Sequence, residues 1–479
     1  WDFAMMKMGL LVLLLTMMVG GHKDPLVEEE KKRILKEQER KLFAEGSLLR
    51  GVESPPPLSS SWEEWVEKMP APLRKDLALY IAQGENHIDW RLAQTKGGCN
   101  CSDVSYSEPQ YSYIYHQGEF WYPNQNDTSN KNSADRSLLK GINTFLREKY
   151  GKDLPSIQWF ARLGSVPQYS EACPCNPHYP PIFVLANTNE QIGFVRRPTV
   201  YLNKQGASDM KHVYTRKIAW DSENKAEKVC WRGDVGTRPG GRERLTALIL
   251  QYKLQQQLPN KGDLFTLATT HRIHYTPYLQ GVTDVNTTEL ATHGAGRPHI
   301  FSRCKYNVHL PGHTMGGYSK ALQNLLPTLT TILFWENPWN EYYYDWLVEG
   351  ENYIRVTPQN IVQKVEWLRQ HDDEALRIAE NAILFYKKYL LWDNINAYWE
   401  WIFLTYMRLS TKITPDLSKH CNCKPTNPPE QICGFCKRKK KEHRPFFDNM
   451  TAVPIDPMID SVIKHLKEHP DETIPPTGR

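Results

Sequence analysis

The stretch KVCWRGDVGTRPGGRERLTAL, residues 228–248, joins two apolar segments through a loop rich in glycine and arginine. The run Val229–Trp231 predicts a strand, and the pattern over residues 243–257 predicts a helix. A loop between a strand and a helix presents backbone N–H groups and the positive end of the helix dipole. Glycine lets the backbone approach an anion closely, and arginine binds diphosphate oxygens in pairs. The stretch therefore predicts a diphosphate clamp, with a basic surface loop as the alternative.

The segments that follow this stretch alternate between strand and helix patterns. The further strands that we expect are Leu264–Thr269, Tyr306–His309, Thr331–Trp335 and Tyr353–Val356. The further helices that we expect cover residues 318–326, 360–370, 374–391 and 394–409. Such alternation predicts parallel βαβ units in a Rossmann-like sheet, whose ligands bind where strands end and helices begin.

The region before residue 215 shows weaker but similar patterns. Tyr113–Tyr122 predicts a hairpin with its turn at Gln117-Gly118, and residues 137–150 predict an amphipathic helix. Ile157–Leu163 and Pro181–Ala186 predict two more strands. This region is therefore expected to form a first globular unit ahead of the alternating one.

The N-terminal residues indicate a secretory compartment. Met5-Met6-Lys7 precedes the apolar run Met8–Val19, so residues 1–22 are predicted to be a signal peptide, with a short uncleaved membrane anchor as the alternative. Residues 23–61 are expected to form a charged helical stem followed by a Pro/Ser linker. Glycosylation sequons at Asn126, Asn286 and Asn449 agree with secretion.

Composition describes an ordinary globular protein of 479 residues, with 40% hydrophobic and 24% charged residues. A net charge of +5 spread over this length does not indicate a nucleic-acid partner, and none is expected. The basic run Lys437–Lys441 is interpreted as a solvated surface segment.

The chain contains 10 cysteines, an even number that favours disulfides in an oxidising compartment. Closely spaced cysteines more often pair elsewhere than with each other. The set Cys421, Cys423, Cys433 and Cys436 could instead hold zinc, and the sequence leaves this choice and the connectivity open.

The sequence lacks the motifs of several other kinds of active site. The chain has no GxxxxGK[ST] phosphate loop, no HExxH, no GxSxG and no complete GxGxxG. It also lacks the DxD pair that holds a divalent metal in many sugar-nucleotide enzymes, so no metal is expected. The histidines between residues 271 and 313 show no metal-binding spacing, and structural or surface roles are favoured for them.

Residues 303–356 carry a second set of motifs, RCKYNVHLPGHTMGGYSKALQNLLPTLTTILFWENPWNEYYYDWLVEGENYIRV. The order CKYNVHLPG, YSKALQNLLP, ILFWENPWNEYYYDWL and NYIRV resembles glycosyltransferase family 90. That family includes the Rumi-type protein O-glucosyltransferases and the capsule-associated xylosyltransferases. The WRGD and GGRERL elements of the opening stretch are similar to its Arg-Gly element and later arginine.

The resemblance implies an α/β fold of the GT-B type, with two Rossmann-like domains facing across a cleft and a helical C-terminal crossover. We accordingly expect an acceptor-side domain at residues 62–215, a nucleotide-sugar domain with terminal helices at 216–410, and a Cys- and Lys-rich extension at 411–479. The donor would be a UDP-sugar, with UDP-glucose and UDP-xylose favoured. The acceptor would be a protein or glycan hydroxyl in the lumen of the endoplasmic reticulum or Golgi.

The resemblance also assigns residues to the donor. Arg232 and Arg242 would bind the diphosphate, and Glu341 would face the ribose or the donor sugar. The complete predicted donor-binding set is Arg232, Gly233, Thr237, Arg242, Ser319, Lys320, Trp339 and Glu341. Lys320 could instead be a solvated helix residue, and Glu341 a carboxylate placed by a helix dipole.

Two positions depart from the family pattern. Ser165 falls where the Rumi-type enzymes carry the Asp that serves as general base, and Tyr318 replaces an arginine. A serine hydroxyl cannot accept a proton near neutral pH as a carboxylate does. The sequence therefore supports two hypotheses, an active glycosyltransferase and a catalytically inactive relative that binds nucleotide-sugar or glycan.

Overall fold

The structure is a computed structural model of the full chain. It describes residues 51–89, 111–123, 144–161, 181–189, 194–198, 218–235, 240–269, 301–312, 321–412, 414–415, 417, 420–421 and 455–476. The predicted signal peptide, nearly all of the predicted stem and the three sequons lie outside these residues. We call the described residues up to 198 the N-terminal half, and those from 218 to 412 the C-terminal half.

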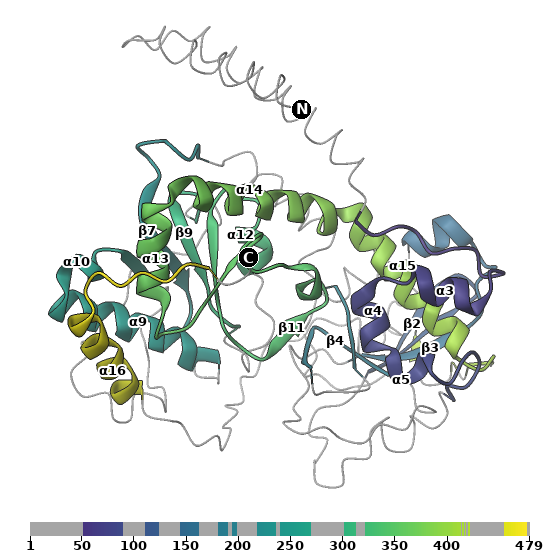
Figure 1. Ribbon diagram of the computed structural model, residues 1–479. Coiled ribbons are helices and arrows are strands. Elements are labelled where there is room, and N and C mark those ends of the chain that lie inside the picture. Colours follow the sequence, from purple (N-terminus) through teal and green to yellow (C-terminus); the bar gives the residue numbers. More distant parts are fainter. Residues whose placement is uncertain are drawn as a thin grey trace, which may run out of the picture. The chain divides into compact units, whose positions relative to one another are not determined.

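A five-stranded parallel sheet forms the centre of the C-terminal half (Figure 1). Its spatial order is β12-β10-β9-β7-β8. The strands are β7 (Ala226–Gly233), β8 (Phe265–Thr269), β9 (Cys304–His309), β10 (Thr331–Trp335) and β12 (Ile354–Val356). Every one of the five predicted strands is confirmed, since apolar runs bounded by polar turns mark buried parallel strands clearly.

The five predicted helices of this half are present, and one short helix, α10, was not predicted. They are α9 (Gly240–Gln257), α10 (Pro259–Gly262), α12 (Ala321–Leu325), α13 (Ile361–Gln370), α14 (Asp372–Tyr389) and α15 (Trp392–Leu409). An apolar core containing Leu248, Leu333 and Val365 holds helices α9 and α13 together with the sheet. Gln251 of α9 also binds the backbone of edge strand β8, because its side chain bonds both the N–H and the C=O of Leu267.

The N-terminal half contains a six-stranded mixed sheet of order β13-β2-β1-β3-β4-β6. Its strands are β1 (Tyr111–His116), β2 (Glu119–Pro123), β3 (Ile157–Ala161), β4 (Ile182–Val184), β6 (Phe194–Arg196) and β13 (His420–Cys421). Only β3, β4 and β6 run parallel, so this sheet is less regular than the Rossmann-like sheet expected here. The predicted β1–β2 hairpin is confirmed, and Gln117 and Gly118 adopt the positive φ values that its turn requires.

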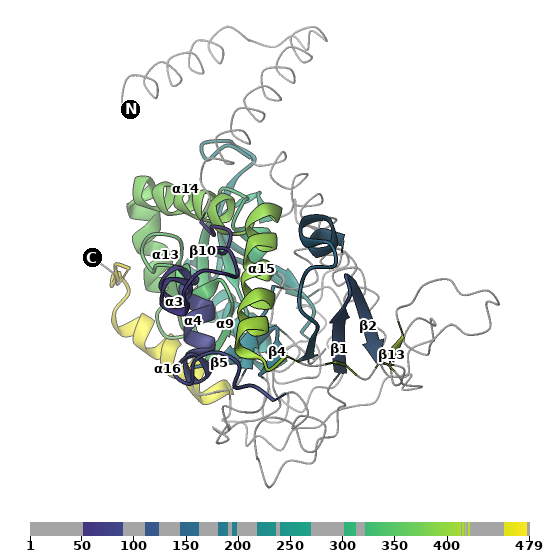
Figure 2. The same cartoon turned by 90° about the vertical axis from the view of Figure 1, so that its right-hand side faces the viewer.

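The last long helix of the C-terminal half packs against the N-terminal half. The chain turns sharply between α14 and α15 (Figure 2). Trp401 of α15 contacts Trp65 of α3 (Trp62–Lys68), with ring centroids 5.1 Å apart, and Tyr406 donates to the carbonyl of Gln158. Two short helices, α4 (Ala71–Asp76) and α5 (Ala78–Ile81), follow α3. The helix α15 therefore shares one apolar core with elements that precede it by more than 200 residues.

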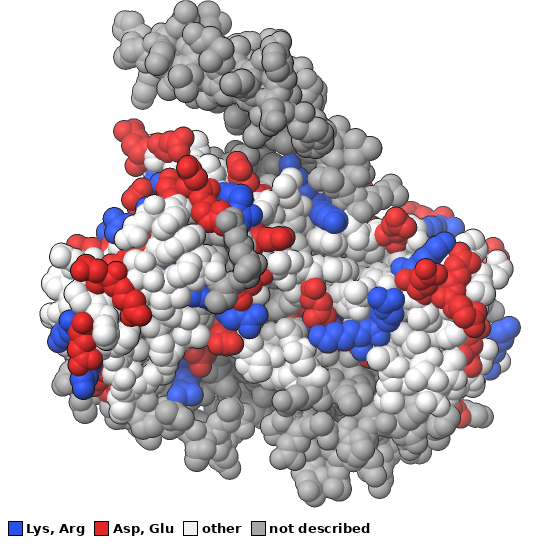
Figure 3. All heavy atoms as spheres, viewed as in Figure 1, with Lys and Arg blue, Asp and Glu red and all other residues white. Residues whose placement is uncertain are grey.

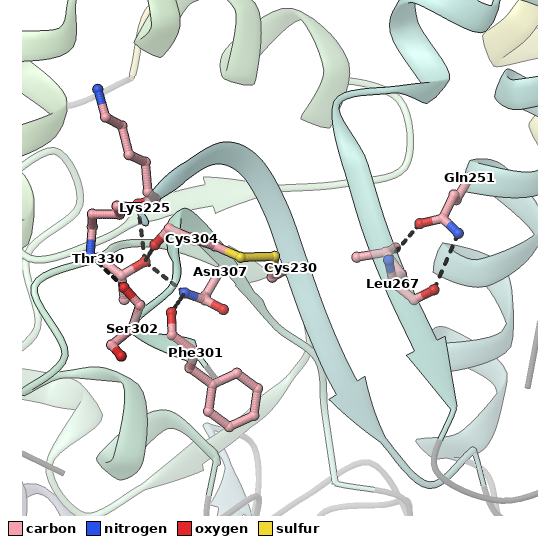
Figure 4. The surroundings of a disulfide bond; sticks show 10 residues. Lys225, Cys230, Gln251, Leu267, Phe301, Ser302, Cys304, Asn307 and Thr330 are labelled. Carbon is pink, nitrogen blue, oxygen red and sulfur yellow. Dashed lines mark hydrogen bonds between the residues drawn. A yellow bond between two sulfur atoms is a disulfide. The ribbon is translucent and has the colours of Figure 1, made fainter. Parts of the chain in front are cut away.

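A disulfide joins Cys230 of β7 to Cys304 of β9, with Cα atoms 6.1 Å apart (Figure 4). These are the two cysteines that stand alone in the sequence, without a neighbour two or three residues away. Around the bond, Lys225 donates to the carbonyl of Ser302, and Asn307 donates to the carbonyl of Phe301. This pairing supports the predicted use of cysteine for disulfides.

A further helix, α16 (Ile455–Glu468), was not predicted from the sequence. It lies beside α9 (Figure 1), and its buried apolar side chains belong to the same core as those of α9. Lys253 of α9 also pairs with Asp456 and Asp460. The predicted extension at 411–479 therefore includes a structural element that covers the sheet domain.

The surface view shows acidic and basic side chains interspersed on the face drawn, without a broad field of one sign among the described residues (Figure 3). Within the described part of the chain, no helix combines the length and the apolar character needed to span a membrane.

Candidate functional site

The topology of the parallel sheet defines a switch point between β7 and β9. The chain leaves β7 for β8 on one side of it and later returns to β9 on the other. In open parallel sheets, ligands bind outside the carboxyl ends of the strands at such a point. Gly233 and His309 end the two strands here, so the residues around them form the candidate site.

Two of the predicted diphosphate residues lie at this edge. Arg232 is the penultimate residue of β7, and Arg242 lies in the first turn of α9; both side chains are partly buried. The fold thus places both residues at the two ends of the strand-to-helix connection where the sequence predicted an anion site. Their role as a clamp stays a prediction.

Gly233 is needed here for steric reasons. A Cβ atom at this position would lie 2.6 Å from Cζ2 of the Trp231 side chain, which is closer than real Cβ contacts. Trp231 is itself buried, so a larger residue would displace an indole ring of the core. The close packing explains the Trp-Arg-Gly order at the end of the strand.

Arg244 is a buried residue at the same edge of the sheet, and it was not assigned to the site from the sequence. Its Nε donates to the carbonyl of Pro311 at 2.8 Å, and Nη1 donates to the carbonyl of Asp234 at 2.5 Å. Its guanidinium also lies over the ring of Trp231, 5.6 Å from the centroid. Burial lowers the pKa of Arg244 to about 10, so the group stays charged at neutral pH. Arg244 thereby ties α9 to the residues that follow both β7 and β9.

The first turn of α9 has one more anchor. Nε1 of Trp335, at the end of β10, donates to a carboxylate oxygen of Glu243 at 2.8 Å. The two neighbours of Glu243 are Arg242 and Arg244, so this bond and the Arg244 bonds fix the turn on both sides. A rigid turn lowers the entropy lost when an anion binds to it.

His309 occupies the end of the central strand and is 1% exposed. Its Nε2 lies 3.3 Å from the hydroxyl of Tyr344, and its ring lies 4.9 Å from that of Phe334. Burial, and secondarily the nearby charge of Arg244, lower the pKa of His309 to about 3. The imidazole is therefore neutral throughout the physiological range. Sequence reasoning assigned it no more than a structural or surface role.

Glu341 and Trp339, two further predicted donor-binding residues, lie in β11 (Trp339–Glu341). Glu341 is 1% exposed and accepts a 3.0 Å hydrogen bond from the hydroxyl of Tyr344. The same hydroxyl faces His309, so the structure brings Glu341 to the end of the central strand through Tyr344. Glu341 precedes a single 3-10 turn, Tyr344–Trp346. Contact with the donor stays a prediction for both residues.

The remaining predicted site residues lie outside the described part of the chain. They are Ser165, Thr237, Ser319 and Lys320. The position of Ser165 relative to Arg232 is thus not described, and neither is Tyr318.

Within the described residues, no group of three or more His, Cys, Asp or Glu side chains is arranged to hold a metal ion. The cysteines considered for zinc are outside this search, except for Cys421. The expectation that the diphosphate charge is balanced without a metal stays a prediction.

Comparison with known proteins gives a family match and matches to individual relatives. Residues 130–441 match the family described as glycosyl transferase family 90. The chain is 24% identical over 264 residues to protein O-glucosyltransferase 2 of Danio rerio, covering 53% of this chain and 48% of that protein. It is 29% identical over 182 residues to uncharacterized protein 035R of Invertebrate iridescent virus 3, covering 37% of this chain and 16% of that protein. The chain thus spans about half the length of the zebrafish relative, and less of the viral one.

Proposed function

Because the chain belongs to glycosyl transferase family 90, we propose that it transfers a hexose or pentose from a UDP-sugar to a hydroxyl of a protein or glycan. The observation that supports this proposal is the placement of Arg232 at the end of β7 and of Arg242 at the start of α9, on either side of the loop that follows β7 at the switch point of the sheet. A diphosphate leaving group gains negative charge in the transfer. Fixed guanidinium groups and helix N–H groups stabilise that charge without reorganisation.

The proposed architecture is GT-B, with domains at residues 62–215 and 216–410. Two features support it: the parallel sheet of the C-terminal half, and the return of α15 to the N-terminal half. The zebrafish relative's name, protein O-glucosyltransferase 2, supports a glucose donor and a protein acceptor. UDP-xylose is the alternative donor.

The proposed compartment is the lumen of the endoplasmic reticulum or Golgi. The Cys230–Cys304 disulfide supports an oxidising compartment, because such bonds persist in the secretory pathway and are rare in the cytosol.

The clamp can be tested with Arg242→Ala. Hydrogen bonds to charged groups contribute about 1.5–3 kcal/mol, so this variant should bind UDP about 10- to 100-fold more weakly in isothermal titration. Lys253→Ala is a suitable control, since Lys253 lies on the same helix and pairs with α16. Equal UDP affinity of Arg242→Ala and the wild type would contradict the clamp.

The metal-free proposal predicts that UDP binding and sugar transfer persist in EDTA. Arg232, Arg242, Lys320 and the start of α9 would balance the charge of the diphosphate. Transfer should be measured after dialysis against chelator, with and without added Mn²⁺. Activity that disappears in EDTA and returns with Mn²⁺ would show that a cation takes part.

The inactive-relative hypothesis rests on Ser165. General base catalysis contributes about 10²–10⁴-fold, so the wild type should transfer sugar slowly while still binding UDP if no other carboxylate acts. Ser165→Asp should then raise the transfer rate at least about tenfold. Ser165→Asn is the matched control, because asparagine has nearly the shape of aspartate but lacks its basic carboxylate. Rapid transfer by the wild type would remove the basis of this second hypothesis.

A further inference from the structure

One segment of the C-terminal half is held by the N-terminal half. Residues 339–346, which we call the bridging segment, lie between strands β10 and β12 in the chain. Its strand β11 pairs antiparallel with β5 (Ala186–Thr188), so that Glu341 lies opposite Ala186. This two-stranded sheet is separate from the parallel sheet, although both contain residues of the C-terminal half.

Arg196 of β6 fastens the bridging segment from the N-terminal half. Its Nη2 lies 2.5 Å from Oδ2 of Asp345, and its Nη1 donates to the carbonyl of Glu341 at 3.4 Å. Its Nε and Nη2 also contact Asp76 of α4 at 2.8–2.9 Å. The buried guanidinium of Arg196 therefore holds the bridging segment at two points, the Glu341 carbonyl and the Asp345 carboxylate.

Between these two anchors lies Tyr344, whose hydroxyl connects Glu341 to His309. A tyrosine hydroxyl carries a single proton, and Glu341 accepts it. The hydroxyl oxygen can therefore only accept toward His309, which requires the proton of the neutral ring to reside on Nε2. This leaves Nδ1 of His309 as a lone-pair acceptor, and no described residue donates a hydrogen bond to it.

A buried acceptor without a donor is destabilising, because it has lost its hydrogen bond to water without replacement. The sugar nucleotide proposed above carries hydroxyl groups that could satisfy this acceptor. His309 ends β9 and Gly233 ends β7, the two strands that flank the switch point, and ligands bind at such strand ends in this sheet topology.

We propose that Nδ1 of His309 accepts a hydrogen bond from a hydroxyl of the bound sugar nucleotide, and that Tyr344 and Glu341 are positioning residues that fix its tautomer. This inference rests on the proposed function, because it requires a sugar nucleotide as the ligand. The hydroxyl belongs either to the ribose or to the donor sugar.

The first test is Tyr344→Phe, which removes the hydroxyl and keeps a ring against Phe334. Nitrogen-15 NMR of histidine-labelled protein should show His309 protonated on Nε2 in the wild type, with this preference lost in the variant. UDP-glucose should bind about tenfold more weakly, as expected for about 1.4 kcal/mol. Tyr342→Phe is the matched control, since the Tyr342 hydroxyl has no hydrogen-bond partner among the described residues.

The second test changes the ring itself and identifies the hydroxyl. His309→Asn keeps an acceptor near the position of Nδ1 and should retain binding, whereas His309→Leu should lose about tenfold or more. Affinities for UDP, 2′-deoxy-UDP and UDP-glucose separate the two sources. If His309→Leu weakens the binding of UDP but not of 2′-deoxy-UDP, the hydroxyl belongs to the ribose. If the variant weakens only the binding of UDP-glucose, the hydroxyl belongs to the donor sugar.

The outcomes separate this inference from the proposed function. If the wild type binds UDP-glucose and folded Tyr344→Phe and His309→Leu bind all three ligands equally well, the inference is wrong and the proposed function stands. If the wild type binds none of the three ligands, both are wrong. Should His309→Leu fail to fold, Tyr344→Phe still decides the question through affinity and the histidine spectrum.

Discussion

Arg196→Ala is expected to lower the free energy of unfolding by about 3–5 kcal/mol, since it breaks a buried ion pair from one side. The Arg196 and Asp76 side chains are 1% and 3% exposed, with Nη2 and Oδ1 separated by 2.8 Å. Despite the cost of burial, Asp76 and Asp345 hold the pKa of Arg196 above its ordinary value. Without the guanidinium, the Asp76 carboxylate would remain buried and would lose the positive charge that Arg196 provides. Urea unfolding followed by fluorescence and circular dichroism measures the change.

Lys68→Ala provides the control for this experiment. Lys68 and Glu64 form an ion pair of the same 2.8 Å length, but their side chains are 54% and 43% exposed. Such an exposed pair contributes little to stability, because water and salt screen the attraction between the two charges. Arg196→Lys should fall between the two, because an ammonium group cannot make the forked contacts with Asp76 and Asp345. Equal losses for Arg196→Ala and Lys68→Ala would contradict the role given to burial.

The chain is also expected to lose stability as the pH falls below 6.5, because His309 cannot accept a proton in the folded state. Its folded pKa of about 3 lies below the ordinary value of 6.5, so the unfolded chain binds the proton more tightly. The stabilising contribution is complete above pH 6.5 and is lost between pH 6.5 and 3. At pH 5 the loss is about 2 kcal/mol, from about 1.4 kcal/mol per pH unit.

His309→Asn isolates this contribution, since asparagine does not titrate. The groups facing His309 are the Arg244 guanidinium, the Tyr344 hydroxyl and the Phe334 ring, and none of them gains a proton in this window. Unfolding free energies of wild type and variant, measured between pH 7 and pH 5, should converge as the pH falls. Curves that stay parallel would show that His309 is not the responsible group.

The sequence predicted the C-terminal half well because its signals are local. Each strand of the parallel sheet is an apolar run, and helices such as α13 and α14 have an apolar face, so these patterns identify them without tertiary information. The motifs at 228–248 and 303–356 correctly predicted family membership, which the match over residues 130–441 confirms. The helix α16 carries the same kind of signal in Ile455, Ile459, Val462 and Leu466, and that pattern could have identified it.

The parts that could not be predicted depend on contacts between distant residues. Arg196 meets Asp76 and Asp345 from 120 and 149 residues away, and nothing in their local sequence pairs them. Strands β5 and β11 are three residues each, too short for a periodic signal. His309 could not be distinguished from the other histidines nearby, because its significance comes from the sheet order and from Tyr344.

The Cys230–Cys304 disulfide closes a covalent ring across a sequence separation of 74 residues, and α9 with Arg242 and Arg244 lies inside that ring. A molecule stretched from its two ends in an optical trap would therefore extend only outside the ring while oxidised. Reduction would release up to about 250 Å of additional contour length, at about 3.4 Å per residue. For the same reason, a protease that cuts the chain once between β7 and β9 would leave the two fragments joined by the disulfide. The helix α9 would then remain covalently linked to both β7 and β9.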